Sequence, residues 1–213
     1  FKHDQKDGVG VLFVNLGTPD APEKGALKRY LKEFLSDRRI VEAPRLLWWF
    51  LLRFVILPRR SGKSAHAYQE VWTERGSPLA YLSEDLVQAV AAELQDLDVK
   101  CVLAMRYGNP SVSSVLDGLA QQQVRRLLVV PLYPQYSATT TASIFDAVSA
   151  HYQQRRWIPE LRFINEYFQH DAWIKAMADH IARHRSQLPK AERLLMSFHG
   201  IPRSYFLKGD PYY

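Results

Sequence analysis

The segment GVGVLFVNLG, residues 8–17, is an apolar run bounded by glycines. A run of this kind is typical of a strand that is buried on both faces. The loop that follows, TPDAP (18–22), leads into residues 24–35, where apolar side chains recur at helical spacing. A buried strand followed by an amphipathic helix predicts the beginning of an α/β fold.

The alternation of strand and helix continues along the chain. We expect further strands at 99–105, 126–132, 161–164 and 193–198, and helices at 61–73, 79–94, 111–123, 139–155 and 170–187. This order predicts a doubly wound parallel sheet, whose strands all end at one edge, where α/β proteins bind ligands. The first loop contains neither G-x-G-x-x-G nor G-K-[ST], so nucleotide binding is disfavoured.

Composition limits the partners. The chain has 213 residues, of which 47% are hydrophobic and 23% charged, and a net charge of +6. The positive charge favours anionic partners, but it is not gathered into a basic tail, so we expect no nucleic-acid partner. The single cysteine, Cys101, excludes an intrachain disulfide and any multi-cysteine metal cluster built from this chain alone. It fits a reducing compartment, and we expect a cytoplasmic protein.

The residues at the predicted strand ends share a character. They include several aromatic rings, one arginine and one histidine, and few carboxylates: Asn15, Leu16, Arg106, Tyr107, Tyr133, Tyr136, Glu166, Tyr167, Ser197 and His199. A tyrosine at a strand end often only packs against the sheet edge. Their convergence predicts a planar, apolar ligand that carries negative charge.

The apolar run LLMSF (194–198) ends in His199, followed by Gly200 and Pro202. We expect a strand that presents this imidazole at the ligand edge of the sheet. The residue either caps the strand or acts on the ligand, and the local sequence leaves both interpretations open.

The segment LLWWFLLRFVIL, residues 46–57, carries only one charge. It is too short to cross a bilayer as a helix, which takes about 20 apolar residues. Pro44 and Pro58 bracket it, and Arg59, Arg60 and Lys63 follow. It is part of the core, a patch that contacts a membrane interface, or one wall of a ligand pocket.

Several motifs together resemble the ferrochelatase family, whose members insert ferrous iron into a porphyrin. They are VNLGTPDAP (14–22), FLSDRRIVEAPRLLWW (34–49), GSPL (76–79), MRYGNPS (105–111), PLYPQYS (131–137), SFHGIP (197–202) and KGDPY (208–212). The pattern is most similar to the proteobacterial branch, whose substrate is protoporphyrin IX. The resemblance therefore implies ferrochelatase activity in haem biosynthesis, a lyase reaction in which Fe²⁺ is a substrate and no cofactor is required.

The resemblance also implies a fold of two similar Rossmann-like halves with the porphyrin in the cleft between them. Residues 1–165 would form the first half, with a porphyrin-covering lip at about 41–60, and 166–213 would begin the second half. Family members continue further and supply an acidic residue opposite the histidine, so we expect a truncated chain that is inactive alone. Ala138 stands where some members have a cluster cysteine, so no iron–sulfur cluster is expected from this segment.

By resemblance, His199 is the catalytic and metal-contacting residue. Arg106, Tyr107 and Tyr133 map onto the cleft wall, and Tyr68 and Ser77 onto positions near the porphyrin edge. From residue chemistry we add Leu16, Trp48 and Trp49 as apolar contacts. Arg59, Arg60, Lys63 and Arg106 are suited to the propionates.

Inserting a divalent metal requires the loss of two pyrrole protons. An imidazole can accept protons near neutral pH, and when neutral it can ligate ferrous iron, so both roles stay open for His199. Two other functions also stay open: a non-catalytic porphyrin or haem carrier, and a chelatase for another tetrapyrrole and metal. The 46–57 lip suggests peripheral contact with the inner membrane, and the oligomeric state is left open.

Overall fold

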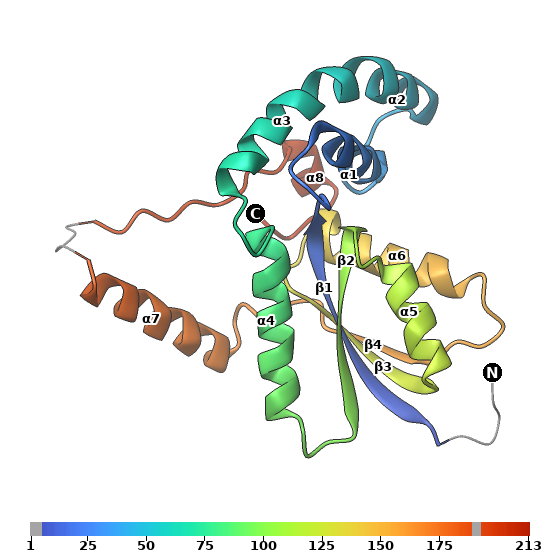
Figure 1. Ribbon diagram of the computed structural model, residues 1–213, viewed down its shortest axis with the longest axis vertical. Coiled ribbons are helices and arrows are strands. Elements are labelled where there is room, and N and C mark those ends of the chain that lie inside the picture. The colour runs from blue at the N-terminus through green and yellow to red at the C-terminus, as the bar shows by residue number, and fades with distance from the viewer. Residues whose placement is uncertain (1–5, 189–192) are drawn as a thin grey trace.

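The computed structural model describes residues 6–188 and 193–213. Its centre is a four-stranded sheet in the order β2-β1-β3-β4. The strands are β1 (Gly8–Thr18), β2 (Val99–Gly108), β3 (Val124–Pro131) and β4 (Glu160–Phe163), and every pairing between them is parallel. The predicted α/β fold with a parallel sheet flanked by helices is confirmed (Figure 1).

Helices cover both faces of the sheet. Helix α4 (Pro78–Glu93) packs on one face, and α5 (Val112–Gln121) and α6 (Ser143–Tyr152) pack on the other (Figure 1). Successive side chains of β1 point to opposite faces. Val11 and Phe13 join the cluster with α4, whereas Leu12 and Val14 join the cluster with α5 and α6. This double burial explains why β1 reads as a continuous apolar run.

The connections reverse direction at β1. The chain first places β2 beside β1, and α5 then carries it back so that β3 pairs with the other side of β1. The loops after β1 and β3 therefore lead to opposite faces of the sheet and leave a crevice between their carboxyl ends. Ligands bind at such a point in doubly wound proteins.

Most of the lip, together with the residues that follow it, forms one long, interrupted helix beside α1 (Lys24–Ser36). It consists of α2 (Arg45–Leu51), the π-helical turn η1 (Leu52–Ile56) and α3 (Leu57–Val71). Pro58 brackets the apolar segment in the sequence, but it does not interrupt the helix, which continues from η1 into α3. The Leu57 N–H donates to the Leu52 carbonyl, five residues earlier, instead of the carbonyl four residues earlier as in an α-helix. The hydrogen-bond pattern therefore already departs from that of an α-helix just before Pro58, which has no backbone N–H to donate. No helix in the described part of the chain is long and apolar enough to cross a membrane.

The predicted strand at 193–198 is absent. These residues pair with none of the described strands, and Leu195, Met196 and Phe198 are 93%, 70% and 70% exposed. An apolar run becomes a parallel strand only where a neighbouring strand offers hydrogen bonds. Helix α7 (Asp171–Ser186), which precedes it, has no buried residue and stands away from the sheet (Figure 1). The domain boundary near residue 165 stays a prediction.

The chain then returns to the carboxyl edge of the sheet. A short helix that we had not predicted, α8 (Arg203–Leu207), lies near α1 (Figure 1). A second π-helical turn, η2 (Ala138–Ala142), precedes α6.

Two glycines allow β1 and β2 to approach closely at their carboxyl ends. Gly17 has φ 104° and Gly108 has φ 85°, values that glycine adopts readily and other residues rarely do. A Cβ on Gly17 would lie 1.8 Å from the Tyr107 carbonyl oxygen, and one on Gly108 would lie 2.6 Å from the Thr18 carbonyl oxygen. The strand ends that border the site therefore require glycine at both positions.

We predict that Gly17→Ala destabilises the protein by roughly 3 kcal/mol, because it combines backbone strain with overpacking. Gly62→Ala is the matched control, since the added methyl group on α3 meets nothing within 4 Å. A glycine inside a helix is less favourable than alanine, so the control should stabilise by about 0.5 kcal/mol. Urea unfolding of both variants measures these differences, and equal stability of Gly17→Ala and wild type would contradict the steric argument.

Candidate functional site

An apolar cavity of about 430 Å³ lies at the carboxyl ends of β1 and β3. Its lining comes from β1, the end of α1, the loop after β3, and the segment after residue 198: Leu16, Phe34, Ile40, Tyr133, Pro134, Gln135, Ser137, Thr139, Thr140, His199, Gly200, Ile201, Pro202, Tyr205 and Tyr212. The cavity thus occupies the place where the connections reverse. Its size is typical of sites for small molecules and cofactors.

Three of the predicted site residues meet in this lining. Leu16 is on β1, Tyr133 follows β3, and His199 belongs to the returning segment. Burial raises the pKa of the Tyr133 phenol, so the hydroxyl keeps its proton at neutral pH. His199 is exposed and lines the cavity beside Gly200 and Ile201. The site therefore combines apolar walls with one accessible imidazole.

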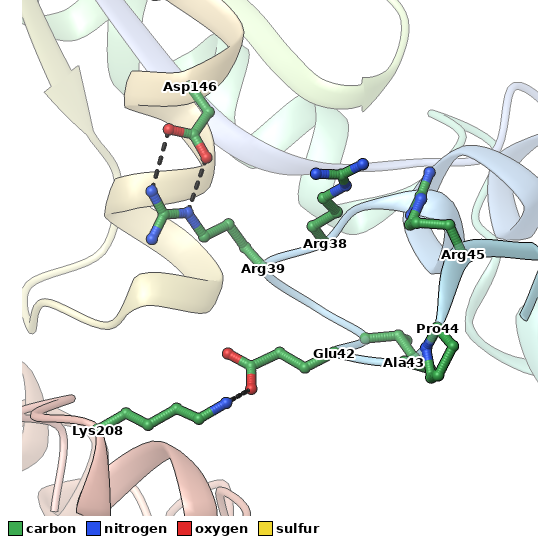
Figure 2. Close-up of a pocket in the computed structure, with 9 residues that line it drawn as sticks. Arg38, Arg39, Glu42, Ala43, Pro44, Arg45, Asp146 and Lys208 are labelled. Atoms are coloured by element: carbon green, nitrogen blue, oxygen red, sulfur yellow. Dashed lines mark hydrogen bonds and ion pairs between the residues drawn. The ribbon is translucent and has the colours of Figure 1, made fainter.

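We had expected a strand to hold His199, but residues 193–198 form no strand. The returning segment is instead fastened to the first part of the chain after the histidine. The Tyr205 hydroxyl donates a hydrogen bond to the Ile40 carbonyl at 3.0 Å. Lys208 forms an ion pair with Glu42 (Figure 2). These contacts connect α8 to the loop after α1.

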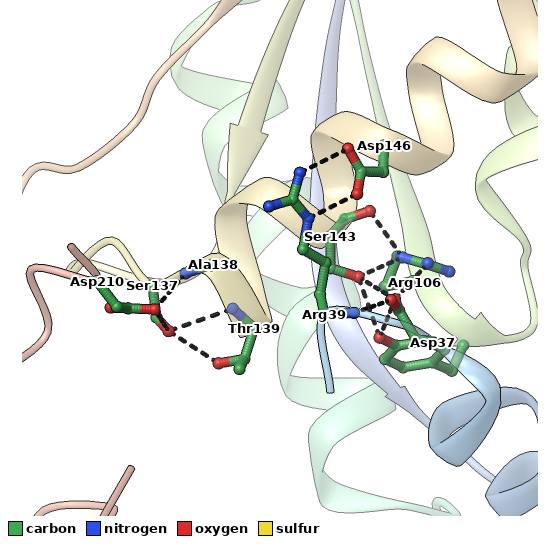
Figure 3. Close-up of polar contacts among 10 residues, drawn as sticks. Asp37, Arg39, Arg106, Ser137, Ala138, Thr139, Ser143, Asp146 and Asp210 are labelled. Atoms are coloured by element: carbon green, nitrogen blue, oxygen red, sulfur yellow. Dashed lines mark hydrogen bonds and ion pairs between the residues drawn. The ribbon is translucent and has the colours of Figure 1, made fainter. Parts of the chain in front are cut away.

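Asp210 provides a buried attachment for the same segment. Its carboxylate accepts hydrogen bonds from the Ser137 hydroxyl at 2.9 Å and from the Ala138 N–H at 2.8 Å (Figure 3). Both donors lie where the loop after β3 enters η2, so Asp210 fastens the chain to the wall that carries Tyr133. The position of His199 depends on these loop contacts.

Arg106 and Tyr107 belong to a polar network centred on Asp37. The Asp37 carboxylate accepts from the Arg106 guanidinium at 2.6 Å and the Tyr107 hydroxyl at 2.7 Å, and also from the Ser143 hydroxyl at 2.6 Å (Figure 3). Burial alone would raise the pKa of Asp37. The hydrogen bonds from Ser143, Tyr107 and the Arg39 N–H, together with the Arg106 charge, outweigh it and lower this pKa below its ordinary value.

The network joins three elements at the edge of the sheet. Asp37 follows α1, Arg106 and Tyr107 end β2, and Ser143 begins α6. The Arg106 Nε also donates to the Ser143 carbonyl at 2.9 Å. Neither Arg106 nor Tyr107 lines the cavity described above, so the structure gives both a part in holding the cavity walls. Their direct contact with a ligand stays a prediction.

The remaining predicted site residues lie around α1 and the lip, and none of them lines this cavity. Ser77 is buried and accepts a hydrogen bond from the Thr18 hydroxyl at 2.8 Å. Tyr68 packs edge-on against Tyr30, with ring centroids 6.4 Å apart. Arg59 and Arg60 are exposed on α3. Their roles toward a ligand also stay predictions.

The two tryptophans of the lip have different surroundings. Trp48 donates its indole N–H to the Leu35 carbonyl at 2.7 Å and packs against Leu35, Leu52 and Leu57. Trp49 is 53% exposed, and the Arg53 guanidinium lies 5.8 Å from its ring centroid. Among the three interpretations of this segment, Trp48 therefore fits the core, whereas Trp49 belongs to an exposed apolar surface.

Sequence reasoning missed several residues that build the site. They are Asp37, Ser143, Phe34, Ile40, Tyr205, Tyr212 and Asp210. Asp37 did carry a signal, because an acidic residue at a helix C-terminus opposes the helix dipole and calls for a cationic partner. For Ile40 and Tyr205 no local signal exists, since their contact spans 165 residues.

No three His, Cys, Asp or Glu side chains within 6–188 and 193–213 gather closely enough to hold a metal ion. In the cavity lining the imidazole of His199 is the group from this set. As a lone donor it suits transient contact with a metal ion held mainly by other ligands.

The fold and the cavity define a class, the doubly wound α/β proteins with an apolar cavity where the strand connections reverse. Comparison with known families narrows this class. The profile of the Ferrochelatase family matches residues 8–213. The chain belongs to the ferrochelatase family, as its motifs predicted.

Individual relatives agree with this assignment. The chain is 52% identical over 216 residues to the ferrochelatase of Idiomarina loihiensis and 52% identical over 216 residues to that of Teredinibacter turnerae. It is 53% identical over 220 residues to the ferrochelatase of Hydrogenovibrio crunogenus. Each alignment covers the whole of this chain. It covers 59%, 59% and 58% of the length of the three relatives, in the same order. The chain therefore spans somewhat less than two thirds of the length of these relatives.

We predict that Asp37→Asn destabilises the protein by roughly 3 kcal/mol at neutral pH, because it leaves the largely buried Arg106 without a countercharge. The pKa of Asp37 is lower in the folded protein than in the unfolded chain. The ionised carboxylate therefore contributes its full stabilisation of the folded state above the unfolded-state pKa. This contribution is lost as the pH falls through the folded-state pKa. The difference between wild type and variant should therefore shrink below about pH 4.

Asp146→Asn is the matched control for this prediction. Asp146 pairs with Arg39 at 2.7 Å, but both side chains are more than 40% exposed, so its loss should cost less than about 1 kcal/mol. Urea unfolding between pH 7 and pH 3 measures both variants. Equal effects of the two substitutions at pH 7 would contradict the central role of Asp37.

Proposed function

We propose that the full-length gene product inserts ferrous iron into protoporphyrin IX, forming protohaem in haem biosynthesis. The observation that carries this proposal is the meeting of Leu16, Tyr133 and His199 in one apolar cavity, in a chain of the ferrochelatase family. Ferrous iron enters as a substrate, and the proposal includes no resident cofactor. The relatives' name supports the same reaction.

His199 is the proposed proton acceptor. As iron enters the macrocycle, two pyrrole N–H bonds break, the nitrogen lone pairs bind the metal, and two protons must leave. The imidazole accepts these protons one at a time and passes them to solvent, to which its side chain is exposed. In its neutral form the same ring can contact the arriving metal.

The apolar walls have a separate task. A flat porphyrin directs its nitrogen lone pairs inward, so the macrocycle must bend before a metal can enter. Contacts between the ring edge and apolar side chains such as Leu16, Phe34 and Ile40 supply binding energy that offsets this distortion. Of the two predicted tryptophans of the lip, the exposed Trp49 is proposed to contact the rim directly, whereas Trp48, which packs in the core, supports it from behind.

We predict that His199→Ala in the full-length protein lowers the rate of zinc or iron insertion at least about 100-fold, the usual contribution of a general base. Porphyrin binding, followed by fluorescence quenching, should persist because the apolar walls are unchanged. His180→Ala, on the exposed face of α7, should leave turnover as in wild type. Undiminished insertion by His199→Ala would overturn the assignment, and binding without multiple turnover by wild type would favour a carrier.

The propionate groups of the porphyrin are proposed to bind the cations at the start of α3. Arg59, Arg60 and Lys63 are exposed on the first turns of α3, which directly follows η1 and its exposed Phe54. Arg106 is already paired with Asp37, so it is the least available member of the predicted set. Arg59, Arg60 and Lys63, which form no ion pair within 6–188 and 193–213, are therefore the main candidates.

We predict that Arg59→Gln/Arg60→Gln weakens protoporphyrin binding about tenfold or more, because charge-assisted hydrogen bonds are lost. The dimethyl ester of the porphyrin, which lacks free carboxylates, should bind wild type and variant equally. Fluorescence titration measures the affinity of wild type and of the variant for the free acid and for the dimethyl ester. If wild type binds the ester as tightly as the free acid, the propionate contact has to be abandoned.

We further propose a cytoplasmic location with peripheral contact to the inner membrane through residues 46–57. Leu46, Leu47 and Phe50 are 84%, 58% and 55% exposed on this segment. Exposed apolar side chains beside cations suit an interface with anionic lipid.

A further inference from the structure

A second cleft, of about 590 Å³, lies on the other side of the loop after α1. It is lined by residues of that loop, by Asp146 on α6 and by Lys208 after α8 (Figure 2). Four of its lining side chains are cationic, Arg38, Arg39, Arg45 and Lys208, and two are anionic, Glu42 and Asp146. The cleft therefore carries an excess of positive charge.

Each of the two carboxylates is paired with one of the cations. Arg39 donates to both oxygens of Asp146, at 2.7 and 3.1 Å. Lys208 pairs with Glu42. These pairs leave no negative charge in the lining for the remaining two guanidinium groups.

Among the residues that the structure describes, neither Arg38 nor Arg45 forms an ion pair with a carboxylate. Arg45 donates one N–H to the Ser36 carbonyl at 2.8 Å, and its other guanidinium N–H groups have no hydrogen-bond partner in the same part of the chain. Arg38 makes no hydrogen bond or ion pair with any described residue. Figure 2 shows both side chains rising on the same side of the loop, away from the pair formed by Glu42 and Lys208. Two such guanidinium groups offer planar N–H forks that match an oxyanion.

This cleft is distinct from the cavity that contains His199, because the two linings share no residue. Ile40 faces the cavity, whereas its neighbours Arg39 and Val41 face the cleft. A ligand of the cleft therefore need not be the porphyrin. Neutralising two guanidinium groups takes a dianion or two separate anions, and one phosphate group supplies that charge in a single tetrahedral group.

We propose that this cleft is a phosphate-binding site in which Arg38 and Arg45 are the principal donors. The phosphate belongs either to a soluble phosphate compound or to the headgroup of an anionic phospholipid. The second source is favoured by the neighbouring start of α2, where Leu46 and Leu47 directly follow Arg45 and are 84% and 58% exposed. The site is independent of metal insertion and does not rest on the proposed function.

The test compares Arg38→Gln/Arg45→Gln with wild type in the full-length protein. Lys28→Gln/Lys32→Gln is the control, since it removes the same charge from exposed positions on α1 outside both linings. The probes are inorganic phosphate, followed by calorimetry, and vesicles of phosphatidylcholine with or without phosphatidylglycerol, followed by co-sedimentation. The substitutions change exposed side chains, so circular dichroism should report an unchanged fold.

We expect the arginine variant to lose at least about tenfold in affinity for a phosphate-bearing probe, as expected for charge-assisted bonds, while the lysine variant keeps wild-type affinity. Loss toward inorganic phosphate as well as toward phosphatidylglycerol vesicles would indicate a site for soluble phosphate compounds. Loss toward phosphatidylglycerol vesicles alone would indicate the headgroup. Absence of binding to every probe by wild type, or equal losses in both variants, would overturn the proposal.

Discussion

The parallel pairing of β1 with β2 on one side and with β3 on the other is the constraint on which the rest of the structure depends. It places β1 in the middle of the sheet, where its side chains are buried on both faces against α4 on one side and α5 and α6 on the other. It also forces the two connections to opposite faces, and this separation opens the crevice at the strand ends. The cavity with Leu16, Tyr133 and His199 lies there because the topology leaves room at that point.

The loop after α1 connects the separate parts of this edge. Its first residue, Asp37, holds the ends of β2 and α6 through Arg106, Tyr107 and Ser143. Ile40 lines the cavity and accepts the hydrogen bond that fastens the segment carrying His199. Arg38 lines the cleft on the opposite side, together with Arg45, the first residue of α2 after the loop. A single short loop therefore touches the polar network, the apolar cavity and the cleft, and a change in its conformation would reach all three.

The sequence predicted the parallel sheet well, because local patterns report burial directly. The strands near residues 8, 99, 126 and 161 were found within a few residues, since runs such as that of β1 are apolar enough to be buried. The strand at 193–198 failed for a physical reason. Its pattern fits a strand, but strand formation depends on a partner elsewhere in the chain, and none of the described strands pairs with it.

The site was predictable only in part, for a similar reason. Leu16 and Tyr133 follow from the rule that parallel strands end at one edge, whereas His199 was found through its family motif, because the strand expected to carry it is absent from the described residues. Asp37, Ser143 and Asp210 act through contacts that span 69 to 106 residues, and no local pattern encodes such distances. The sequence could not distinguish the two tryptophans of the lip. Trp48 is identified as a core residue by its hydrogen bond to the Leu35 carbonyl, whereas its neighbour Trp49 is exposed.

We propose that the macrocycle binds where the connections reverse, between the ends of β1 and β3. A crystal structure of the full-length protein with bound protoporphyrin would show this directly. We expect electron density for the ring against Leu16 and Tyr133, with the His199 imidazole facing its nitrogen atoms. A porphyrin bound elsewhere, for example on the outer surface of α2 with the cavity empty, would contradict it.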